Sequence, residues 1–135
     1  MSSTDRRLRV LVVDDEALIV WALSETLRRR GHTVVEASSA RAAREEIGHA
    51  PSFDVALLDY RLPDSNGIEV LEDLRRRSPG TAVILMTAFG SPEVVQAAME
   101  RGAHCVVSKP FDMNDVEGLV QEAYQDGHLH QRRRT

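Results

Sequence analysis

Four short segments of the chain place side chains that bind cations or phosphate directly after runs of apolar residues. They are Asp14-Asp15-Glu16 after Leu8–Val13, Asp59 after Val55–Leu58, Thr87 after Ala82–Met86, and Ser108-Lys109 after Cys105–Val107. Carboxylates gathered in one place repel one another unless a cation or a proton joins them. Oxygen ligands suit Mg²⁺, which is often held by one or two carboxylates together with a phosphate. If the four segments meet in space, they form a site for Mg²⁺ and a phosphoryl group.

Lys109 is the only lysine among 17 basic residues, and the other 16 are arginines. Arginine presents a broad planar fork, whereas lysine ends in a compact, strongly hydrated ammonium on a flexible stem. A lysine kept in a chain that otherwise uses arginine indicates a site that needs a compact charge, such as a phosphate-binding site. Chance placement of a single lysine is the alternative.

Each of these polar groups also has an ordinary structural explanation. Asp14 or Asp15 could cap the following helix, and Asp59 could open a turn. Thr87 could be a strand-end hydroxyl and Lys109 a solvated charge. Taken together, the ordinary explanations are weaker than a shared site, because one edge of the predicted sheet would gather three carboxylates, a hydroxyl and an ammonium. Asp59 is then the natural nucleophile, since a carboxylate can accept a phosphoryl group, with catalysis mainly from in-line positioning and charge neutralisation.

Short β-branched runs alternate with helical patterns from one end of the chain to the other. We expect strands at Leu8–Val13, Thr33–Ala37, Val55–Leu58, Ala82–Met86 and Cys105–Val107, and helices at about Ala17–Arg30, Ala40–Gly48, Ile68–Arg77, Pro92–Arg101 and Asp112–Gln125. Five strands alternating with five helices predict an α/β, doubly wound fold with a parallel sheet covered on both faces. Ligands of such folds bind outside the carboxyl ends of the strands, where the four polar segments lie.

Composition limits the remaining possibilities. The 135 residues are enough for one domain, and we expect a flexible N-terminus at 1–7, the domain at 8–126 and a polar tail or the start of a linker at 127–135. A net charge of −4 argues against direct nucleic-acid binding by this domain. No apolar run reaches the roughly 18 residues that cross a bilayer, and a single cysteine suits a reducing cytoplasm.

The ordered set of motifs resembles the receiver domain of two-component response regulators. The matching segments are Val12–Glu16, Leu57–Asp59 with Leu62-Pro63-Asp64 and Gly67, Met86–Ala88, and Ser108–Phe111. The resemblance spans roughly Leu8–Tyr124 and implies a flavodoxin-like (βα)₅ fold with strand order 2-1-3-4-5. The Thr87–Gly90 segment is similar to receivers of the nitrogen-regulator type, which by analogy implies transcriptional or other output control.

The resemblance also implies roles for individual residues. Asp59 would accept a phosphoryl group from a phosphohistidine of a sensor kinase or of a histidine phosphotransfer protein. Asp15 would bind Mg²⁺ (or Mn²⁺ in its place) directly, Asp14 through water, and Arg61 through its main-chain carbonyl, with Asp59 completing the metal site. Thr87 would hydrogen-bond the phosphoryl group and Lys109 would bind one of its oxygens. The Lys109–Pro110 peptide bond would be cis, which aims the ammonium inward at a cost of only about 0.5–1 kcal/mol.

The chain departs from the family pattern at the position where receivers commonly have Tyr or Phe, which here is Val106. In the family that ring rotates inward as the threonine moves, so Thr87 and Val106 are the expected switch residues. Valine is stiff at χ1 and has neither a ring nor a hydroxyl. We expect the loop after Thr87 to move instead, and the output surface, a possible homodimer contact, to be formed by Pro92–Arg101, Cys105–Val107 and Asp112–Gln125. Weaker coupling is the alternative.

Two bulky residues, Arg61 and Phe89, occupy positions that tune dephosphorylation in this family. We expect them to obstruct the hydrolytic water and to give a long-lived phosphoryl group. The alternative is that both side chains point to solvent.

On the first helix, Leu18, Trp21 and Ala22 lie outside or beside the stripe of residues that faces the core. We expect them to help dock the kinase. The alternative is that they are ordinary apolar residues of the surface. The histidines show no convincing metal spacing, so none is assigned a site; they are His32, His49, His104, His128 and His130. Cys105 is interpreted as a small buried hydrophobe.

The leading hypothesis is a signalling domain and not a turnover enzyme. The enzyme alternative is a dehalogenase-like phosphohydrolase, whose aspartyl nucleophile belongs to an Asp-x-Asp pattern after the first strand. Here Asp14 is followed directly by Asp15 and Glu16. A pseudo-receiver that binds partners without phosphorylation is a third possibility, which the complete acidic set disfavours.

Overall fold

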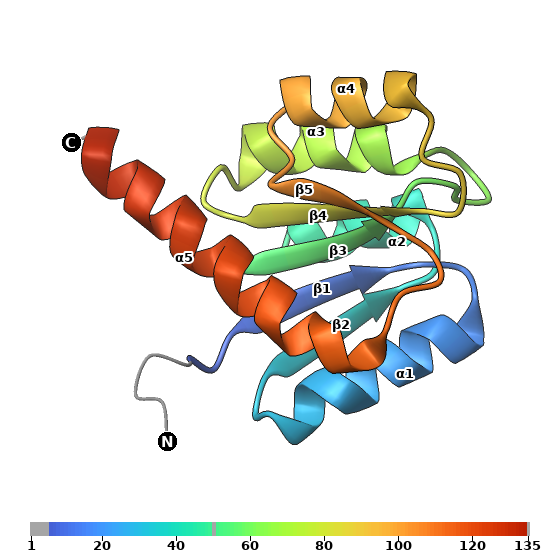
Figure 1. Ribbon diagram of the computed structural model, residues 1–135, viewed down its shortest axis with the longest axis horizontal. Coiled ribbons are helices and arrows are strands. Elements are labelled where there is room, and N and C mark those ends of the chain that lie inside the picture. The colour runs from blue at the N-terminus through green and yellow to red at the C-terminus, as the bar shows by residue number, and fades with distance from the viewer. Residues whose placement is uncertain (1–5, 50, 135) are drawn as a thin grey trace.

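The computed structural model describes residues 6–49 and 51–134, which form one five-stranded parallel sheet with helices on both faces (Figure 1). The strands are β1 (Arg9–Val13), β2 (Thr33–Ala37), β3 (Val55–Asp59), β4 (Ala82–Thr87) and β5 (Cys105–Ser108). The helices are α1 (Ala17–Arg29), α2 (Ala40–Ile47), α3 (Gly67–Arg77), α4 (Pro92–Glu100) and α5 (Val116–Arg134), with a 3₁₀ turn η1 (Met113–Asp115) before α5. The strand order β2-β1-β3-β4-β5 confirms the predicted fold and topology.

Two apolar cores lie on the two faces of the sheet. Helices α1 and α5 cover one face, where Leu23 and Val120 pack with Val12 and Leu57 of the strands. Helices α2, α3 and α4 cover the other face, where the alternate strand residues point. Because both faces are covered, the three central strands are almost continuously apolar.

The last helix differs from the prediction at both ends. Asp112 precedes the 3₁₀ turn, and its carboxylate accepts a hydrogen bond from the Asn114 main-chain N–H at 2.9 Å. The following α5 continues to Arg134, so the expected helix end at Gln125 was wrong. The sequence did not predict this end, because a helix is recognised by the regular spacing of its apolar residues. In α5 the apolar residues that pack on the sheet end near Tyr124.

The structure describes only residues 6 and 7 of the N-terminus that was expected to be flexible, 1–7. Arg6 donates its main-chain N–H to Gln121 Oε1 at 3.3 Å and accepts from Gln121 Nε2 at 2.8 Å, so the chain is joined to α5 before β1 begins. The rest of the expected flexible N-terminus, Met1–Asp5, lies outside the described residues, as do Thr135 and the side chains of His128, His130 and Arg132–Arg134.

None of the helices in the described part of the chain is both long enough and apolar enough to cross a membrane.

Candidate functional site

The polar segments that follow the strands meet at the carboxyl edge of the sheet. Asp59 and Thr87 are the last residues of β3 and β4, and Asp14 and Lys109 directly follow β1 and β5. Asp59, Thr87 and Lys109 border a cavity of about 350 Å³, whose lining residues are Asp15, Glu16, Asp59, Arg61, Leu62, Pro63, Thr87, Ala88 and Lys109. The carboxylate oxygens of Asp14, Asp15 and Asp59 approach within 4.8 Å of one another. The structure thus brings together the six residues expected to hold Mg²⁺ and the phosphoryl group: Asp14, Asp15, Asp59, Arg61, Thr87 and Lys109.

Lys109 supplies the only ammonium of the pocket. Its Nζ donates to Asp14 Oδ2 at 2.6 Å and Glu16 Oε1 at 3.2 Å, and lies 3.3 Å from Asp59 Oδ1. The side chain is 8% exposed, and burial alone would lower its pKa, but the hydrogen bond and charge of Asp14 and the other carboxylates raise it overall. The ammonium therefore stays charged and is closer to Asp14 than to Asp59. The Lys109–Pro110 peptide bond is cis, as expected.

Asp59 is a buried carboxylate with a perturbed pKa. Burial and the neighbouring charge of Asp14 raise the pKa to about 6, against the opposing effects of Lys109 and of the hydrogen bond from the Arg61 main chain. One ammonium therefore does not balance the three carboxylates in the pocket. An oxygen-only donor set with excess negative charge fits a hard dication such as Mg²⁺.

Asp14 is oriented by its own turn and does not cap α1. Its Oδ1 accepts from the Glu16 main-chain N–H at 2.9 Å, and its own main-chain N–H donates to the Ala37 carbonyl at 3.1 Å. Glu16 is the N-cap residue of α1, and its side chain makes no capping hydrogen bond. The structure thus removes the capping explanation for Asp14 and leaves its second carboxylate oxygen, Oδ2, to Lys109.

Gly67 lets the loop after β3 close tightly behind Asp59. A Cβ at this position would lie 2.5 Å from the Asp59 carbonyl oxygen and 2.7 Å from a methyl carbon of Leu85. The Gly67 N–H donates to the Tyr60 carbonyl at 2.8 Å, which starts α3 directly beside the end of β3. Only glycine fits this approach without displacing the backbone of Asp59.

Asp64 ties the same loop to another helix. Its two carboxylate oxygens accept from the main-chain N–H groups of Ala40 and Arg41, both at 2.9 Å. These hydrogen bonds lower the Asp64 pKa and place a negative charge at the start of α2. Sequence reasoning did not foresee this contact, because an aspartate in a short loop signals only a turn.

The rim of the pocket carries the two bulky residues that were expected to slow hydrolysis. The Arg61 guanidinium lies 5.9 Å from the centre of the Phe89 ring, so the two side chains meet, with Phe89 75% exposed. Thr87 is buried, and its hydroxyl oxygen accepts from the Phe89 main-chain N–H at 3.2 Å. Both side chains are exposed as well, so the alternative in which they point to solvent still stands.

Of the two switch candidates, Thr87 lines the cavity, whereas Val106 and the docking candidates lie outside it. Val106 pairs with Leu85 of β4 and packs, half-buried, against the core on the α3 and α4 side of the sheet. On α1, Leu18 is 82% and Trp21 63% exposed, while Ala22 is half-buried. Trp21 and Asp15 line one hollow of about 390 Å³, which therefore adjoins the acidic pocket.

Comparison with known proteins identifies sequence relatives of the chain. A family model described as the response regulator receiver domain matches residues 10–121. Response regulator protein PilR of Pseudomonas aeruginosa is 36% identical over 117 residues, which are 87% of this chain and 26% of PilR. Photosynthetic apparatus regulatory protein RegA of Rhodobacter capsulatus is 35% identical over 118 residues, 87% of this chain and 62% of RegA. The chain thus spans less than two thirds of these relatives.

Solved structures share the fold over nearly the whole chain. A response regulator receiver domain protein (CheY-like) from Methanospirillum hungatei matches with a TM-score of 0.87 at 28% identity, covering 93% of this chain and 99% of that protein. The beryllofluoride-activated NtrC4 receiver domain dimer matches with a TM-score of 0.82 at 32% identity, covering 88% and 98% of the two chains.

Proposed function

Because the chain belongs to the family of response regulator receiver domains, we propose that Asp59 accepts a phosphoryl group from a phosphohistidine of a sensor kinase or of a histidine phosphotransfer protein. One observation carries the proposal: the Asp59 carboxylate faces a cavity together with Lys109, Thr87 and two further carboxylates. The receiver would comprise residues 8–126, act in the cytoplasm, and release its phosphoryl group by hydrolysis without turning over a substrate.

The transfer breaks the phosphorus–nitrogen bond of the donor and forms a phosphorus–oxygen bond to Asp59. The electron pair of the broken bond stays on the imidazole of the donor. Asp59 attacks as the carboxylate, which is its main form at pH 7 because its pKa is about 6. Lys109, already 3.3 Å from Asp59 Oδ1, is placed to bind a phosphoryl oxygen, and the Thr87 hydroxyl to donate to another.

Asp14, Asp15 and Asp59, with the main-chain carbonyl of Arg61, are the residues that would hold Mg²⁺. When bound, the dication supplies the positive charge that draws phosphoryl oxygens to these carboxylates. Without it, the approach of a phosphoryl group is opposed by the four carboxylates of Asp14, Asp15, Glu16 and Asp59. Only the Lys109 ammonium and the Arg61 guanidinium favour it. The reaction should therefore require added Mg²⁺.

The Thr87 hydroxyl couples the pocket to the loop before α4. In the structure it accepts the Phe89 N–H at 3.2 Å, and Ser91 then caps α4 by accepting from the Val94 N–H at 3.3 Å. A hydroxyl turned toward the phosphoryl group loses the Phe89 contact and frees this loop. Val106 has no ring to rotate, so the backbone from Phe89 to Arg101 carries the change to the α4, β5 and α5 surface.

NMR of the phosphorylated protein tests this relay. We expect amide shifts throughout the Phe89–Arg101 segment in the wild type and their loss in Thr87→Ala, while Ser91→Ala, a control in the same loop, keeps them. Shifts confined to the pocket would contradict a moving loop.

Two surfaces are proposed to meet partners. The kinase would dock on Leu18, Trp21 and Ala22, since the hollow beside Trp21 adjoins the acidic pocket. A second copy would pair through α4, β5 and α5, where Val95 and Met99 are exposed, in keeping with the receiver dimer described for NtrC4. Trp21→Ala should lose transfer from the kinase but keep phosphorylation by acetyl phosphate. Equal loss of phosphorylation from both donors would show that Trp21 stabilises the fold and does not dock the kinase.

The central proposal is tested by intact-protein mass with acetyl phosphate as the donor. We expect a mass increase of about 80 Da that needs Mg²⁺ and is absent in Asp59→Asn. Asp64→Asn is the matched control, because Asp64 is a carboxylate of the same loop that faces α2. An adduct that persists in Asp59→Asn, or that forms equally well in EDTA, would contradict the proposal.

A further inference from the structure

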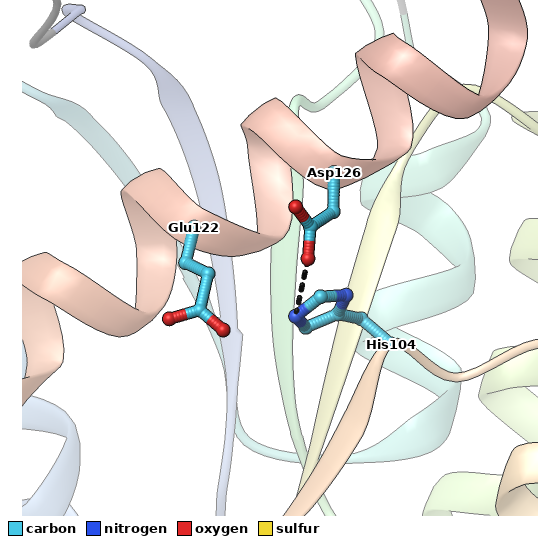
Figure 2. A group of neighbouring side chains, drawn as sticks. All are labelled: His104, Glu122 and Asp126. Carbon is cyan, nitrogen blue, oxygen red and sulfur yellow. Dashed lines mark ion pairs between the residues drawn. The ribbon is translucent and has the colours of Figure 1, made fainter.

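Three potential metal ligands lie together at the edge of the sheet opposite the acidic pocket. His104 directly precedes β5, whereas Lys109 follows the other end of that strand. Figure 2 shows the His104 ring pointing toward α5, from which Glu122 and Asp126 extend toward it. The donor atoms of the three side chains lie within 4.8 Å of one another. No residue of this group takes part in the proposed phosphoryl transfer.

The spacing of the group suits an ion better than a direct contact. His104 Nε2 lies 3.8 Å from Asp126 Oδ2, too far for a hydrogen bond. Two ligand bonds of about 2.1 Å to one metal ion hold their donor atoms about 3–4 Å apart. The imidazole and the Asp126 carboxylate are therefore separated by the distance that a shared ion requires, and a carboxylate oxygen of Glu122 lies within 4.8 Å of both donor atoms.

The charges of the group also favour a cation. Glu122 and Asp126 are four residues apart on α5, where like charges on one helix face repel. Some acidic residues elsewhere in the fold pair with arginine, as Glu36 does with Arg28 and Glu72 with Arg101. Within the described part of the chain, Glu122 has no such basic partner. A dication between Glu122 and Asp126 would replace this repulsion with attraction.

The backbone that carries the ligands is fixed by the fold. The His104 N–H donates to the Val83 carbonyl at 2.7 Å, and the ring is only 20% exposed. Helix α5 is held against the sheet by Val120 and Ala123, which flank Glu122 on the buried face. The group thus joins two rigid elements, and only the ends of two exposed carboxylate side chains need to adjust.

We propose that His104, Glu122 and Asp126 form a second cation site, specific for a first-row transition-metal dication with Zn²⁺ as the best fit. Imidazole suits zinc and its neighbours, whereas Mg²⁺ prefers oxygen ligands. Three protein ligands leave a fourth tetrahedral position for water or for a group from another molecule. Bound metal would link the start of β5 to α5, two of the three elements of the proposed output surface.

Calorimetric titration with Zn²⁺ tests the site in protein saturated with Mg²⁺. His128 and His130 are replaced by alanine in every sample, so that imidazoles of the same helix do not contribute. We expect one zinc per chain, and at least about a tenfold loss of affinity in His104→Ala and in Glu122→Gln. His49→Ala is the matched control, because His49 forms a similar 3.9 Å ion pair with Glu46 on the other side of the sheet.

A second comparison separates this site from the acidic pocket. Asp15→Asn should keep the zinc affinity, and NMR should show zinc-dependent shifts of the His104 ring in both backgrounds. Zinc affinity that is unchanged in His104→Ala and Glu122→Gln would overturn the proposal. So would affinity that is lost in Asp15→Asn, since zinc would then occupy the pocket proposed for Mg²⁺.

Discussion

The two ends of β5 carry two groups of ionisable residues that differ in burial and in the basic residue that each contains. At the carboxyl end, Lys109 contacts the buried carboxylates of Asp14 and Asp59, and Asp14 is fully buried. At the amino end, His104 faces carboxylates that are largely exposed, with no lysine or arginine among the three members of the group. The first group holds charge away from water, where it would act strongly on the proposed phosphoryl group. The second leaves charge in water, where it costs little.

The two groups should differ most in the free energy of unfolding that is lost when the basic residue of each is replaced. Lys109→Met leaves buried carboxylates without their cation, so we expect a loss of about 3–5 kcal/mol in the free energy of unfolding. His104→Asn removes a long ion pair to an exposed carboxylate and should cost less than about 1 kcal/mol. Urea denaturation of the metal-free proteins at pH 7 measures both. Equal losses would remove the distinction between the two ends of the strand.

The carboxylate at the centre of the pocket should destabilise the metal-free protein. The Asp59 pKa is raised from 3.8 to about 6, so its contribution to stability is present below pH 4 and is lost as the pH rises to 6. Asp59→Asn should therefore raise the free energy of unfolding by about 2–3 kcal/mol at pH 7, and by little at pH 4. Denaturation in EDTA at the two pH values measures the difference. Saturating Mg²⁺ should narrow it, and a destabilised Asp59→Asn at pH 7 would contradict the assigned charge balance.

Replacing glycine with alanine should lower stability at the crowded position Gly67 and raise it at the open position Gly118 of α5. Gly67→Ala places a Cβ 2.5 Å from the Asp59 carbonyl oxygen, and we expect a loss of about 1–3 kcal/mol together with slower phosphorylation. Gly118→Ala is the control, because nothing lies within 4 Å of a Cβ there and α5 should gain about 0.5–1 kcal/mol. Thermal unfolding reports both changes. A neutral Gly67→Ala would show that Asp59 is not held by this contact.

The rim of the pocket should give the smallest effect. An exposed contact between Arg61 and Phe89 is worth about 0.5–1 kcal/mol, which corresponds to about a two- to fivefold change in rate if it must open for water to enter. Replacing either residue with asparagine should shorten the lifetime of the phosphoryl group by this factor, and the double variant should add little. Loss of the mass adduct with time measures it. Rapid hydrolysis that is unchanged in both variants would exclude a covering role.

The fold and the main pocket were predictable because the chemistry follows the strands. Each apolar run ends in a polar residue, and parallel strands bring those residues to one edge, so Asp59 and Lys109 could be placed together without coordinates. The sequence did not predict that Lys109 is nearer to Asp14 than to Asp59, or that Asp64 binds the start of α2. Those contacts depend on the path of a loop, which residue types alone do not determine.

The His104 group was missed for a different reason. Glu122 and Asp126 have the spacing of any exposed helix face, and His104 is distant in sequence, so no short motif contains all three. Placing Asp126 beside the start of β5 on a helix also needs a helix that continues past Gln125, where the predicted helix ended. The meeting of Arg61 and Phe89 likewise joins two loops that the sequence treats separately.

The most direct test of the account is to locate the phosphoryl group on the chain. Borohydride reduction after reaction with acetyl phosphate and Mg²⁺ turns an aspartyl phosphate into an alcohol, which peptide mapping by mass spectrometry can locate. We predict reduction at position 59 alone, absent when Mg²⁺ is omitted. Reduction at Asp14, Asp15 or any carboxylate outside the pocket, or no reduced peptide from a protein that carries the adduct, would contradict the assignment of Asp59 as the phosphoryl acceptor.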